Sequence, residues 1–433
     1  MTPESANADA GRLNRPLDEL PSHCDVLVVG AGPAGSAAAQ LLARAGFDVV
    51  MIDRQAFPRD KVCGDGLIPD AHRALRRLGV LDEVLLAGRR ANHVAAIGPR
   101  GGRIDVPGQL AVLPRKQLDL ILCRAATAAG ARMFAPLRFS AAIHGNDHAG
   151  QRVVGARVDA NGMQREIRAR WTILATGAVP QALQAVGMCR RRAPSAVAIR
   201  GYLHNPALAD RVDALEVAWH PSLRGGYGWI FPCGDGLFNI GVGVAHSHGQ
   251  RDDNIGGSPT AMAGIDLRAM LRSFADAYPP AGELIGSGSW VGELKGAPLR
   301  CSLAGADLSR PGLLVAGEAA GSTFAFTGEG IGKALETGML AARTLIDAAE
   351  APTDDETIRA RYEQQVRALQ PLYQVYDRAN VVNRHPWLVD LLVWSARRSP
   401  SRLQRMAGVL DETYMPDNLI NVGSLMRLFF ERG

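Results

Sequence analysis

The sequence predicts an α/β protein with a Rossmann-like nucleotide-binding domain, a mixed β-sheet substrate domain and a helical C-terminal region. An apolar run of strand length ends in a G-x-G-x-x-G turn, and an acidic residue follows about twenty positions later, which predicts the first domain. Short alternating apolar runs, separated by glycine and proline, predict a second sheet. Amphipathic periodicity after residue 355 predicts the C-terminal helices.

The glycine turn opens the nucleotide-binding domain. "DVLVVG" (25–30) is a continuous apolar run, as expected for a parallel strand that is buried on both faces. Glycines in the next turn let backbone N–H groups approach a pyrophosphate at a helix N-terminus. "DVVMID" (48–53) predicts a second strand, whose terminal carboxylate is suited to accept hydrogen bonds from a ribose. The candidate nucleotide-binding residues are Gly30, Gly32, Pro33, Ala34, Gly35, Asp53 and Arg54.

Two later segments indicate which nucleotide is bound. "RWTILATGAVP" (170–180) is a strand that runs into A-T-G and places Gly177 in the turn. "RPGLLVAGEAAGSTFAFTGEGIGKALETGMLAARTL" (310–345) reads as a strand, a glycine-rich turn and a long helix. With these segments the chain resembles flavoproteins of the para-hydroxybenzoate hydroxylase fold. Within that group it most resembles the geranylgeranyl reductase family, with its menaquinone and archaeal-lipid branches, over roughly residues 24–350.

The resemblance implies FAD as the cofactor. Its first motif would hold the ADP half, and G-E-A-A-G (317–321) would hold the ribityl chain and pyrophosphate, with Glu318 where the family usually has Asp. Arg115 begins an R-x-x-x-D-x-x-L helix and would contact FAD, although an ordinary amphipathic helix is the alternative. "FTGEGIG" (326–332) would cradle the flavin pyrimidine, with Ala325 in place of the usual Pro and with Glu329 bracing the helix. The residues of this turn assigned to the cofactor are Gly328, Gly330 and Ile331.

The predicted domains follow from these motifs. Residues 1–22 are expected to be a disordered lead-in, and residues 23–190 with 300–350 form a discontinuous FAD-binding domain. Residues 190–300 form the substrate-binding sheet, which includes a polar loop over 246–264. Residues 355–433 form the helical region, in which 356–382 reads as one long amphipathic helix.

An aromatic strand carries the candidate substrate site. In "GYGWIFP" (226–232), Tyr227, Trp229 and Phe231 alternate, so their side chains lie on one face of a strand. Such a face suits an apolar, elongated substrate, and the resemblance implies a tunnel that leads to the flavin ring. The pattern alone is equally typical of an aromatic core strand.

"RDKVCGDGL" (59–67) carries the candidate acid. The resemblance implies that this loop passes close to the flavin, where Gly64 and its neighbouring glycine would let the backbone approach the ring. Cys63 would lie at the reacting face and contact the cofactor, and its thiol would donate a proton. A packing role for Cys63 is weighed equally, with Tyr227 as another proton source. Asp65 is expected to bond the loop backbone.

Three functions are compatible with these features. The leading prediction is an FAD-dependent oxidoreductase that reduces a C=C bond of an isoprenoid or similar apolar substrate by hydride from reduced flavin. An FAD-dependent monooxygenase is the alternative, as a hydroxylase or, less favoured, a halogenase, because W-x-W-x-I-P is only partly matched and Lys61 is the single nearby lysine. A flavin-binding scaffold would need neither the aromatic face nor the thiol. Only one G-x-G-x-x-G occurs, so NAD(P)H or another external reductant is expected to visit the flavin.

Composition excludes several classes. The chain has 433 residues, 47% of them hydrophobic, and a net charge of +5 without basic–aromatic clusters, so no nucleic acid is expected. The chain has no apolar run long enough to span a membrane. Its six cysteines include no CxxC pair, so reduced thiols, no metal site and a cytoplasmic location are expected. The basic, apolar stretch "PDNLINVGSLMRLFF" (416–430) suggests peripheral membrane contact or packing on the protein body.

Overall fold

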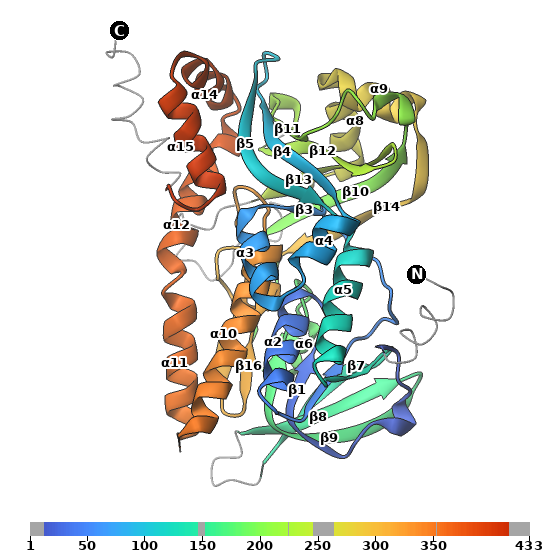
Figure 1. Ribbon diagram of the computed structural model, residues 1–433, viewed down its shortest axis with the longest axis vertical. Helices are drawn as coiled ribbons and strands as arrows, with labels where there is room; N and C mark the ends of the chain where they lie inside the picture. The colour runs from blue at the N-terminus through green and yellow to red at the C-terminus, as the bar shows by residue number, and fades with distance from the viewer. Residues whose placement is uncertain (1–12, 146–151, 224, 246–263, 352, 415–433) are drawn as a thin grey trace.

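The computed structural model describes residues 13–145, 152–223, 225–245, 264–351 and 353–414. In this part of the chain two large sheets lie one above the other, and helices cover the first sheet and run along one side of both (Figure 1). The predicted α/β class is confirmed.

The first sheet has the order β15-β16-β9-β1-β2-β6, and β7 and β8 extend from β9. Its centre is parallel: β1 pairs with β2 on one side and with β9 on the other. Residues 26–29 of β1 are almost fully buried, as the continuous apolar run predicts. The strands are β1 (His23–Val29), β2 (Val49–Ile52), β6 (Arg132–Phe134), β7 (Arg138–His144), β8 (Val153–Ala160), β9 (Met163–Leu174), β15 (Ser309–Arg310) and β16 (Leu313–Val315).

Three helices pack near the first sheet: α2 (Pro33–Arg44), α5 (Arg115–Ala128) and α10 (Ile331–Glu350). α2 starts at the glycine turn, and α10 crosses it so closely that a Cβ at Gly338 would lie 2.1 Å from the carbonyl oxygen of Ala34. The N-terminus of α2 is thereby fixed at the carboxyl ends of β1 and β2, where open α/β sheets bind their ligands.

The second sheet is mixed and has the order β14-β10-β13-β12-β11-β4-β5-β3. Its strands are β3 (Gly66–Leu67), β4 (Arg89–Ile97), β5 (Arg103–Val112), β10 (Ala196–His204), β11 (Leu215–Ala218), β12 (Gly226–Gly234), β13 (Leu237–Ala245) and β14 (Ser289–Leu299). Helices α8 (Leu267–Ala277) and α9 (Pro279–Ser287) adjoin it. Strands β3 to β5 lie within the stretch 23–190 that the sequence assigned to the cofactor domain, and their backbone pairs within this second sheet.

The C-terminal region is helical, but the single long helix expected over 356–382 is wrong. It is divided into α11 (Asp355–Arg367), α12 (Gln370–Ala379) and α13 (Val381–Arg384). Pro371 lies in the first turn of α12, where its missing N–H is tolerated and where it cannot continue α11. The chain then turns into α14 (Trp387–Arg398) and α15 (Pro400–Leu410), which pack on β4 and β5 (Figure 1).

The remaining helices are short connections: η1 (Leu17–Glu19), α3 (Pro69–Leu78), α4 (Leu81–Ala87), α6 (Gln181–Ala185), η2 (Pro206–Leu208), η3 (Pro221–Leu223) and η4 (Gly317–Ala320). Residues 13–22, expected to be disordered, are ordered. Leu13 is 1% exposed in the main core, and the side-chain amide of Asn14 bonds both the N–H and the carbonyl of Phe57. Residues 1–12, the loop over 246–263 and the stretch over 416–430 lie outside the described residues.

Candidate active site

One cavity of about 810 Å³ lies where the two sheets meet. Its walls come from the turn after β1, the loop that precedes β3, strand β12, the turn before α10 and the inner faces of α14 and α15. Nearly all the residues that the sequence singled out line it: Gly30, Gly32, Pro33, Ala34, Asp53, Arg54, Cys63, Gly64, Arg115, Gly177, Tyr227, Trp229, Phe231, Glu318, Gly328, Gly330 and Ile331. Gly35 lies behind the wall, since a Cβ there would be 1.8 Å from the carbonyl oxygen of Gly30.

One end of the cavity is built to hold an anion. Gly32 is the N-cap of α2, and a Cβ placed there would lie 3.7 Å from a guanidinium nitrogen of Arg59 and 3.9 Å from one of Arg115. Two cations therefore face the N-terminus of a helix, whose free N–H groups and dipole also attract negative charge. This combination suits a pyrophosphate.

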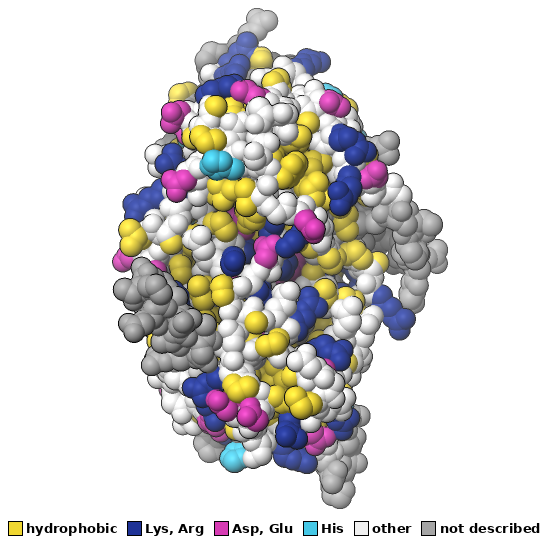
Figure 2. All heavy atoms as spheres, turned by 90° about the vertical axis from the view of Figure 1, so that its right-hand side faces the viewer, with side chains coloured by type: hydrophobic (Ala, Val, Ile, Leu, Met, Phe, Trp, Pro, Cys, Tyr) yellow, Lys and Arg dark blue, Asp and Glu magenta, His cyan; other side chains and the backbone are white. Residues whose placement is uncertain are grey.

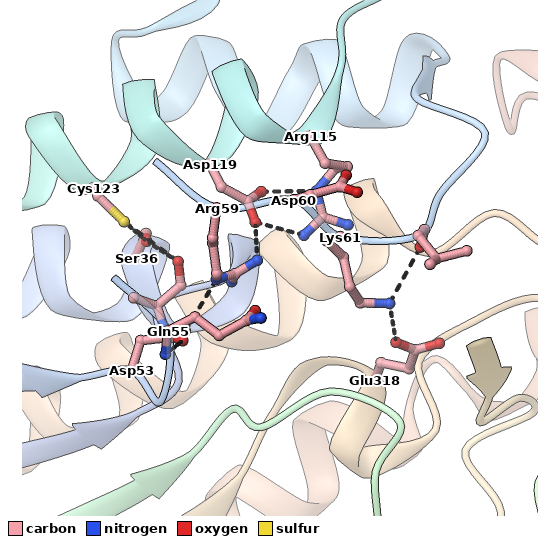
Figure 3. Close-up of polar contacts among 12 residues, drawn as sticks. Ser36, Asp53, Gln55, Arg59, Asp60, Lys61, Arg115, Asp119, Cys123 and Glu318 are labelled. Atoms are coloured by element: carbon pink, nitrogen blue, oxygen red, sulfur yellow. Dashed lines mark hydrogen bonds and ion pairs between the residues drawn. The ribbon is translucent and has the colours of Figure 1, made fainter. Parts of the chain in front are cut away.

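Buried carboxylates hold these two guanidinium groups in place (Figure 3). Asp119 accepts hydrogen bonds at 2.7 and 2.9 Å from Arg115 and lies 3.0 Å from a guanidinium nitrogen of Arg59. Arg59 also lies 3.4 Å from Asp53, whose carboxylate accepts the backbone N–H groups of Ala31 and Gln55 at 3.0 Å. The R-x-x-x-D spacing thus pairs residues one helical turn apart, and the arginine side chain is oriented before any ligand arrives.

A second ion pair lies farther along the cavity. The ammonium of Lys61 is 3.6 Å from the carboxylate of Glu318, and both side chains line the cavity (Figure 3). Glu318 lies in η4, and the carboxylate is also 3.8 Å from a Cβ placed at Gly177. The two late motifs therefore meet on one wall of the cavity.

The loop that carries Cys63 packs against the aromatic strand. A Cβ at Gly64 would lie 3.2 Å from the ring of Phe231, and a Cβ at Gly66 would be equally close to that ring. The glycines thus bring the loop against Phe231, in addition to the approach toward the flavin that the sequence suggested. Burial raises the pKa of the Cys63 thiol above its ordinary value, so the sulfur keeps its proton at neutral pH.

Asp65 braces this loop from the inside. It has a φ of 66° and is fully buried. Its carboxylate accepts hydrogen bonds from the backbone N–H of Arg115 at 3.1 Å, the hydroxyl of Tyr202 at 2.5 Å and the amide of Asn239 at 2.7 Å. Asn239 also donates to the carbonyl of Cys63 at 2.7 Å. Burial raises the pKa of Asp65 to about 6, although these hydrogen bonds oppose the shift.

The aromatic side chains of β12 form a continuous row. Ring centroids of Tyr227 and Trp229 are 6.3 Å apart, and those of Trp229 and Phe231 are 6.4 Å apart. The indole N–H of Trp229 donates to Asn239, so this ring is fixed in orientation. The hydroxyl of Tyr227 donates to the carbonyl of Thr327, and burial raises its pKa. The row therefore presents an apolar wall, and its one hydroxyl is directed at the turn before α10.

The far end of the cavity is apolar and is closed by the C-terminal helices. Its walls there come from α14 and α15 on one side and from β4 and β5 on the other. The lining residues at this end are Val94, Ala96, Ile104, Val106, Val389, Leu392, Val393, Met406, Val409 and Leu410. No charged side chain is among them, so this end suits a hydrocarbon chain.

Several residues of the site could not be assigned from the sequence. Arg59 begins the stretch over 59–67 but had no predicted role there, and Asn239 had none either; only the fold brings them to the cavity wall or to its supporting loop. A signal existed for Asp119, since it is the acidic member of the R-x-x-x-D helix. Among the described residues, no group of three or more His, Cys, Asp or Glu side chains is arranged to hold a metal ion.

The fold and this cavity define a class of protein. The cavity offers FAD an anion-binding helix N-terminus with two guanidinium groups, a carboxylate beside the second strand and a second glycine turn, all on one wall. These residues fit the cofactor from its ADP half to its ring. The protein is an FAD-dependent oxidoreductase of the para-hydroxybenzoate hydroxylase fold.

Comparison with known proteins agrees and narrows the class. Residues 23–213 match a family model described as an FAD binding domain. The chain is 33% identical to menaquinone reductase of Mycolicibacterium smegmatis, over 75% of this chain and 76% of that one. It is 29% identical to digeranylgeranylglycerophospholipid reductase 1 of Methanopyrus kandleri, over 78% and 84% of the two chains. The chain belongs to the geranylgeranyl reductase family.

Two solved structures share the fold. A geranylgeranyl bacteriochlorophyll reductase-like protein from Thermoplasma acidophilum superposes with a TM-score of 0.72 at 22% identity, covering 95% of this chain and 96% of the other. A flavin-dependent brominase superposes with a TM-score of 0.69 at 16% identity, covering 95% and 100% of the two chains. At these identities the likeness establishes the architecture and leaves the reaction open.

Proposed function

We propose that this oxidoreductase reduces a C=C bond in an isoprenoid chain, carried by a quinone, a lipid or a similar apolar molecule. The observation that carries the proposal is the cavity, which joins a flavin-sized polar end to an apolar end lined by α14 and α15. The names of the similar reductases, which refer to menaquinone and to geranylgeranyl lipids, support this substrate class.

The chain's own residues have distinct roles in this proposal. Gly32, Arg59 and Arg115 hold the pyrophosphate of FAD, and Asp53 accepts from its ribose. When bound and reduced, FAD supplies the hydride. Cys63 holds a proton at its sulfur beside the cavity, because burial keeps the thiol neutral.

The substrate is held by shape rather than by charge. The rings of Trp229 and Phe231 form the wall along which an extended chain would lie, and the helices of the C-terminal region exclude water from the far end. Saturating an isolated double bond needs a proton for one carbon and hydride for the other, and the thiol of Cys63 meets the first need. An external reductant, NAD(P)H or another donor, supplies the electrons.

Anaerobic reoxidation tests this function. The purified protein is reduced with dithionite without oxygen, and geranylgeranyl lipid or menaquinone is then added. The expected result is return of the oxidised flavin spectrum together with a product whose isoprenoid chain, located by mass fragmentation, is two mass units heavier, which distinguishes C=C reduction from reduction of a quinone ring. A monooxygenase would reoxidise only when oxygen is admitted and would give an oxygenated product, and a flavin scaffold would turn over neither substrate. Either of these outcomes contradicts the proposal.

We also propose that the protein contacts a membrane through the outer face of α14. Trp387 and Trp394 are 57% and 42% exposed and seven residues apart, so they lie on one face of the helix. Arg398 lies over the Trp394 ring at 4.1 Å, and the opposite face of the same helix lines the apolar end of the cavity. Exposed tryptophan beside arginine is typical of a surface that binds anionic lipid. No helix among the described residues is long and apolar enough to cross a membrane.

Flotation with liposomes tests this contact. The parental protein is expected to float with phosphatidylglycerol vesicles, and a Trp387→Ser/Trp394→Ser variant is expected to float several-fold less. Trp290→Ser is the matched control, because Trp290 is 40% exposed on the edge strand β14. Figure 2 shows the side of the molecule that is on the right in Figure 1, where hydrophobic side chains are interspersed with Lys and Arg. Flotation that is equal in all three proteins, or absent from all three, would remove α14 as the contact.

A further inference from the structure

A group of buried carboxyl side chains lies behind the turn over 326–332. Asp70 lies in the first turn of α3, Glu329 precedes α10, and Glu412 follows α15. The ammonium of Lys333 in α10 is 2.7 Å from a carboxylate oxygen of Glu412 and 3.8 Å from one of Asp70. Segments from three distant parts of the chain therefore converge on one ammonium group.

Among the residues that the structure describes, the negative charges in this group outnumber the positive ones. Glu336 lies 3.0 Å from Lys333, so the carboxyl groups number four, whereas the cations that face them are Lys333 and Arg73. The other titratable groups that face them are His72 of α3 and the two tyrosines of α12, Tyr373 and Tyr376. All three are neutral at pH 7, since burial lowers the pKa of His72 to about 4 and raises those of the tyrosines.

Asp70 and Glu329 face each other within this group, and the excess of negative charge is greatest there. Neither carboxylate oxygen of Asp70 has a hydrogen-bond donor, and Oε1 of Glu329 is buried without one. Burial, together with the charge of Asp70, raises the pKa of Glu329 well above its ordinary value. Gly332 leaves the space for this arrangement, since a Cβ there would lie 2.1 Å from Oδ2 of Asp70. Two carboxyl groups that face each other without a donor favour holding one proton between them, because the charge of one raises the pKa of the other.

The group extends from the cavity, at Glu329, to the solvent, at Glu412 and Arg73. Glu329 lines the cavity and lies in the turn that receives the hydroxyl of Tyr227. Glu412 is 14% exposed and bonds Arg73, which is 41% exposed, so the opposite end of the group reaches solvent. The ring of Phe324 lies between these two ends. It is 5.7 Å from the ammonium of Lys333 and is stacked on Tyr376.

We propose that Glu329 and Asp70 share one proton and release it into the cavity when the bound flavin or substrate is reduced. The O–H bond of the shared carboxyl breaks, its electron pair stays on the carboxylate, and the proton passes to the group that takes up electrons in the cavity. Lys333 compensates the second negative charge while the protein stays reduced, and a proton from solvent returns by way of Glu412 after reoxidation. The release of the proton rests on the proposed function, whereas the sharing of the proton rests on the geometry alone.

Infrared spectroscopy of the FAD-free protein tests the shared proton without any activity. At pH 8 the parental protein is expected to show the carbonyl stretch of a protonated carboxylic acid, which Glu329→Gln and Asp70→Asn should each abolish. Glu336→Gln is the matched control, because Glu336 bonds the same Lys333 but is 31% exposed, and it should keep the band. Absence of the band from the parental protein, or its survival in both variants, overturns the proposal, and the parental spectrum decides this point even if a variant does not fold.

Potentiometry of the FAD-loaded protein tests the release. In Glu329→Gln the midpoint potential of the flavin is expected to change more steeply with pH between 6 and 9 than in the parental protein and in Glu336→Gln, because reduction then takes from solvent the proton that the pair otherwise supplies. An unchanged slope in a variant that has lost the infrared band would show a proton that is shared but never released, and it would overturn the proposed role. A protein that passes both measurements but reduces no isoprenoid would contradict the proposed function alone.

Discussion

Among single residues, Cys63 bears most directly on the chemistry. Cys63→Ala is expected to keep the FAD content near that of the parent, because the loop is held by Asp65 and Asn239 rather than by the sulfur. If the thiol donates the proton, product formation should fall by roughly a hundred-fold or more, the usual scale for loss of a positioned acid. Cys63→Ser should stay low as well, since a hydroxyl is a far weaker acid. Single-turnover assays with flavin absorbance measure both quantities.

A loss of only several-fold in Cys63→Ala would show that the sulfur packs beside the cofactor. In that case the hydroxyl of Tyr227 would be the next proton source to test, by Tyr227→Phe. That change also removes the hydrogen bond to the carbonyl of Thr327, so its effect on FAD content must be measured alongside turnover.

Asp65 predicts a pH dependence of stability with a definite sign. Its pKa is about 6 in the folded protein, above the ordinary value, so between pH 4 and 6 the folded protein keeps a proton that the unfolded chain has lost. Stability must then fall as pH rises through this window. Asp65→Asn lacks the titration, so its free energy of unfolding relative to the parent should rise by about 3 kcal/mol from pH 4 to 7, at about 1.4 kcal/mol for each unit of pKa. Urea unfolding across this range measures the difference, and a difference that does not change with pH would contradict the assignment.

At the scale of elements, the contact between the Cys63 loop and β12 depends on a missing side chain. Gly64→Ala would place a methyl group 3.2 Å from the ring of Phe231, and we expect it to cost about 1–2 kcal/mol of unfolding free energy through overpacking. Adding Phe231→Leu should recover part of that loss, which a double-mutant cycle detects. Gly286→Ala in α9, where a Cβ would meet nothing within 4 Å, is the control and should be close to neutral. Simple additivity of the two changes would show that the loop does not rest on this ring.

The turn between β1 and α2 allows a graded test of cofactor binding. A Cβ at Gly32 still leaves 3.7 Å to Arg59, so Gly32→Ala should retain much of the FAD, whereas Gly32→Leu should fill the space between the two guanidinium groups. The leucine variant is expected to purify colourless, with its folded structure preserved by circular dichroism. Equal FAD in Gly32→Leu and in the parent, measured by absorbance after denaturation, would place the pyrophosphate elsewhere.

For the whole molecule, the cavity lies where the two sheets meet, and a cofactor bound in it would contact parts of both. Removal of FAD is expected to lower the melting temperature, because a ligand at a thousand times its Kd stabilises the folded state by about 4 kcal/mol. Melting curves measured over a titration of FAD check this. A melting temperature that does not depend on FAD would contradict binding of the cofactor between the two sheets.

The sequence by itself determined the parts that local patterns encode. The apolar run before Gly30 defined β1, the acidic end of the second strand defined Asp53, and alternation placed Tyr227, Trp229 and Phe231 on one face. The resemblance supplied the cofactor and the fold, because both are carried by short motifs with fixed spacing. Each of these motifs is one short stretch of the chain, although the choice of FAD also needed the stretches over 170–180 and 310–345.

Only the tertiary structure decided which distant residues meet. β3 to β5 joined the second sheet because their backbone groups pair there, and residues 13–22 became ordered because Leu13 is buried in the core. Arg59 reached the anion site through its ion pair with Asp119, and Glu329 came to face Asp70 because α3, α10 and the end of α15 pack together. Burial and charge at such meeting points depend on the whole packing arrangement, which no local spacing in the chain encodes.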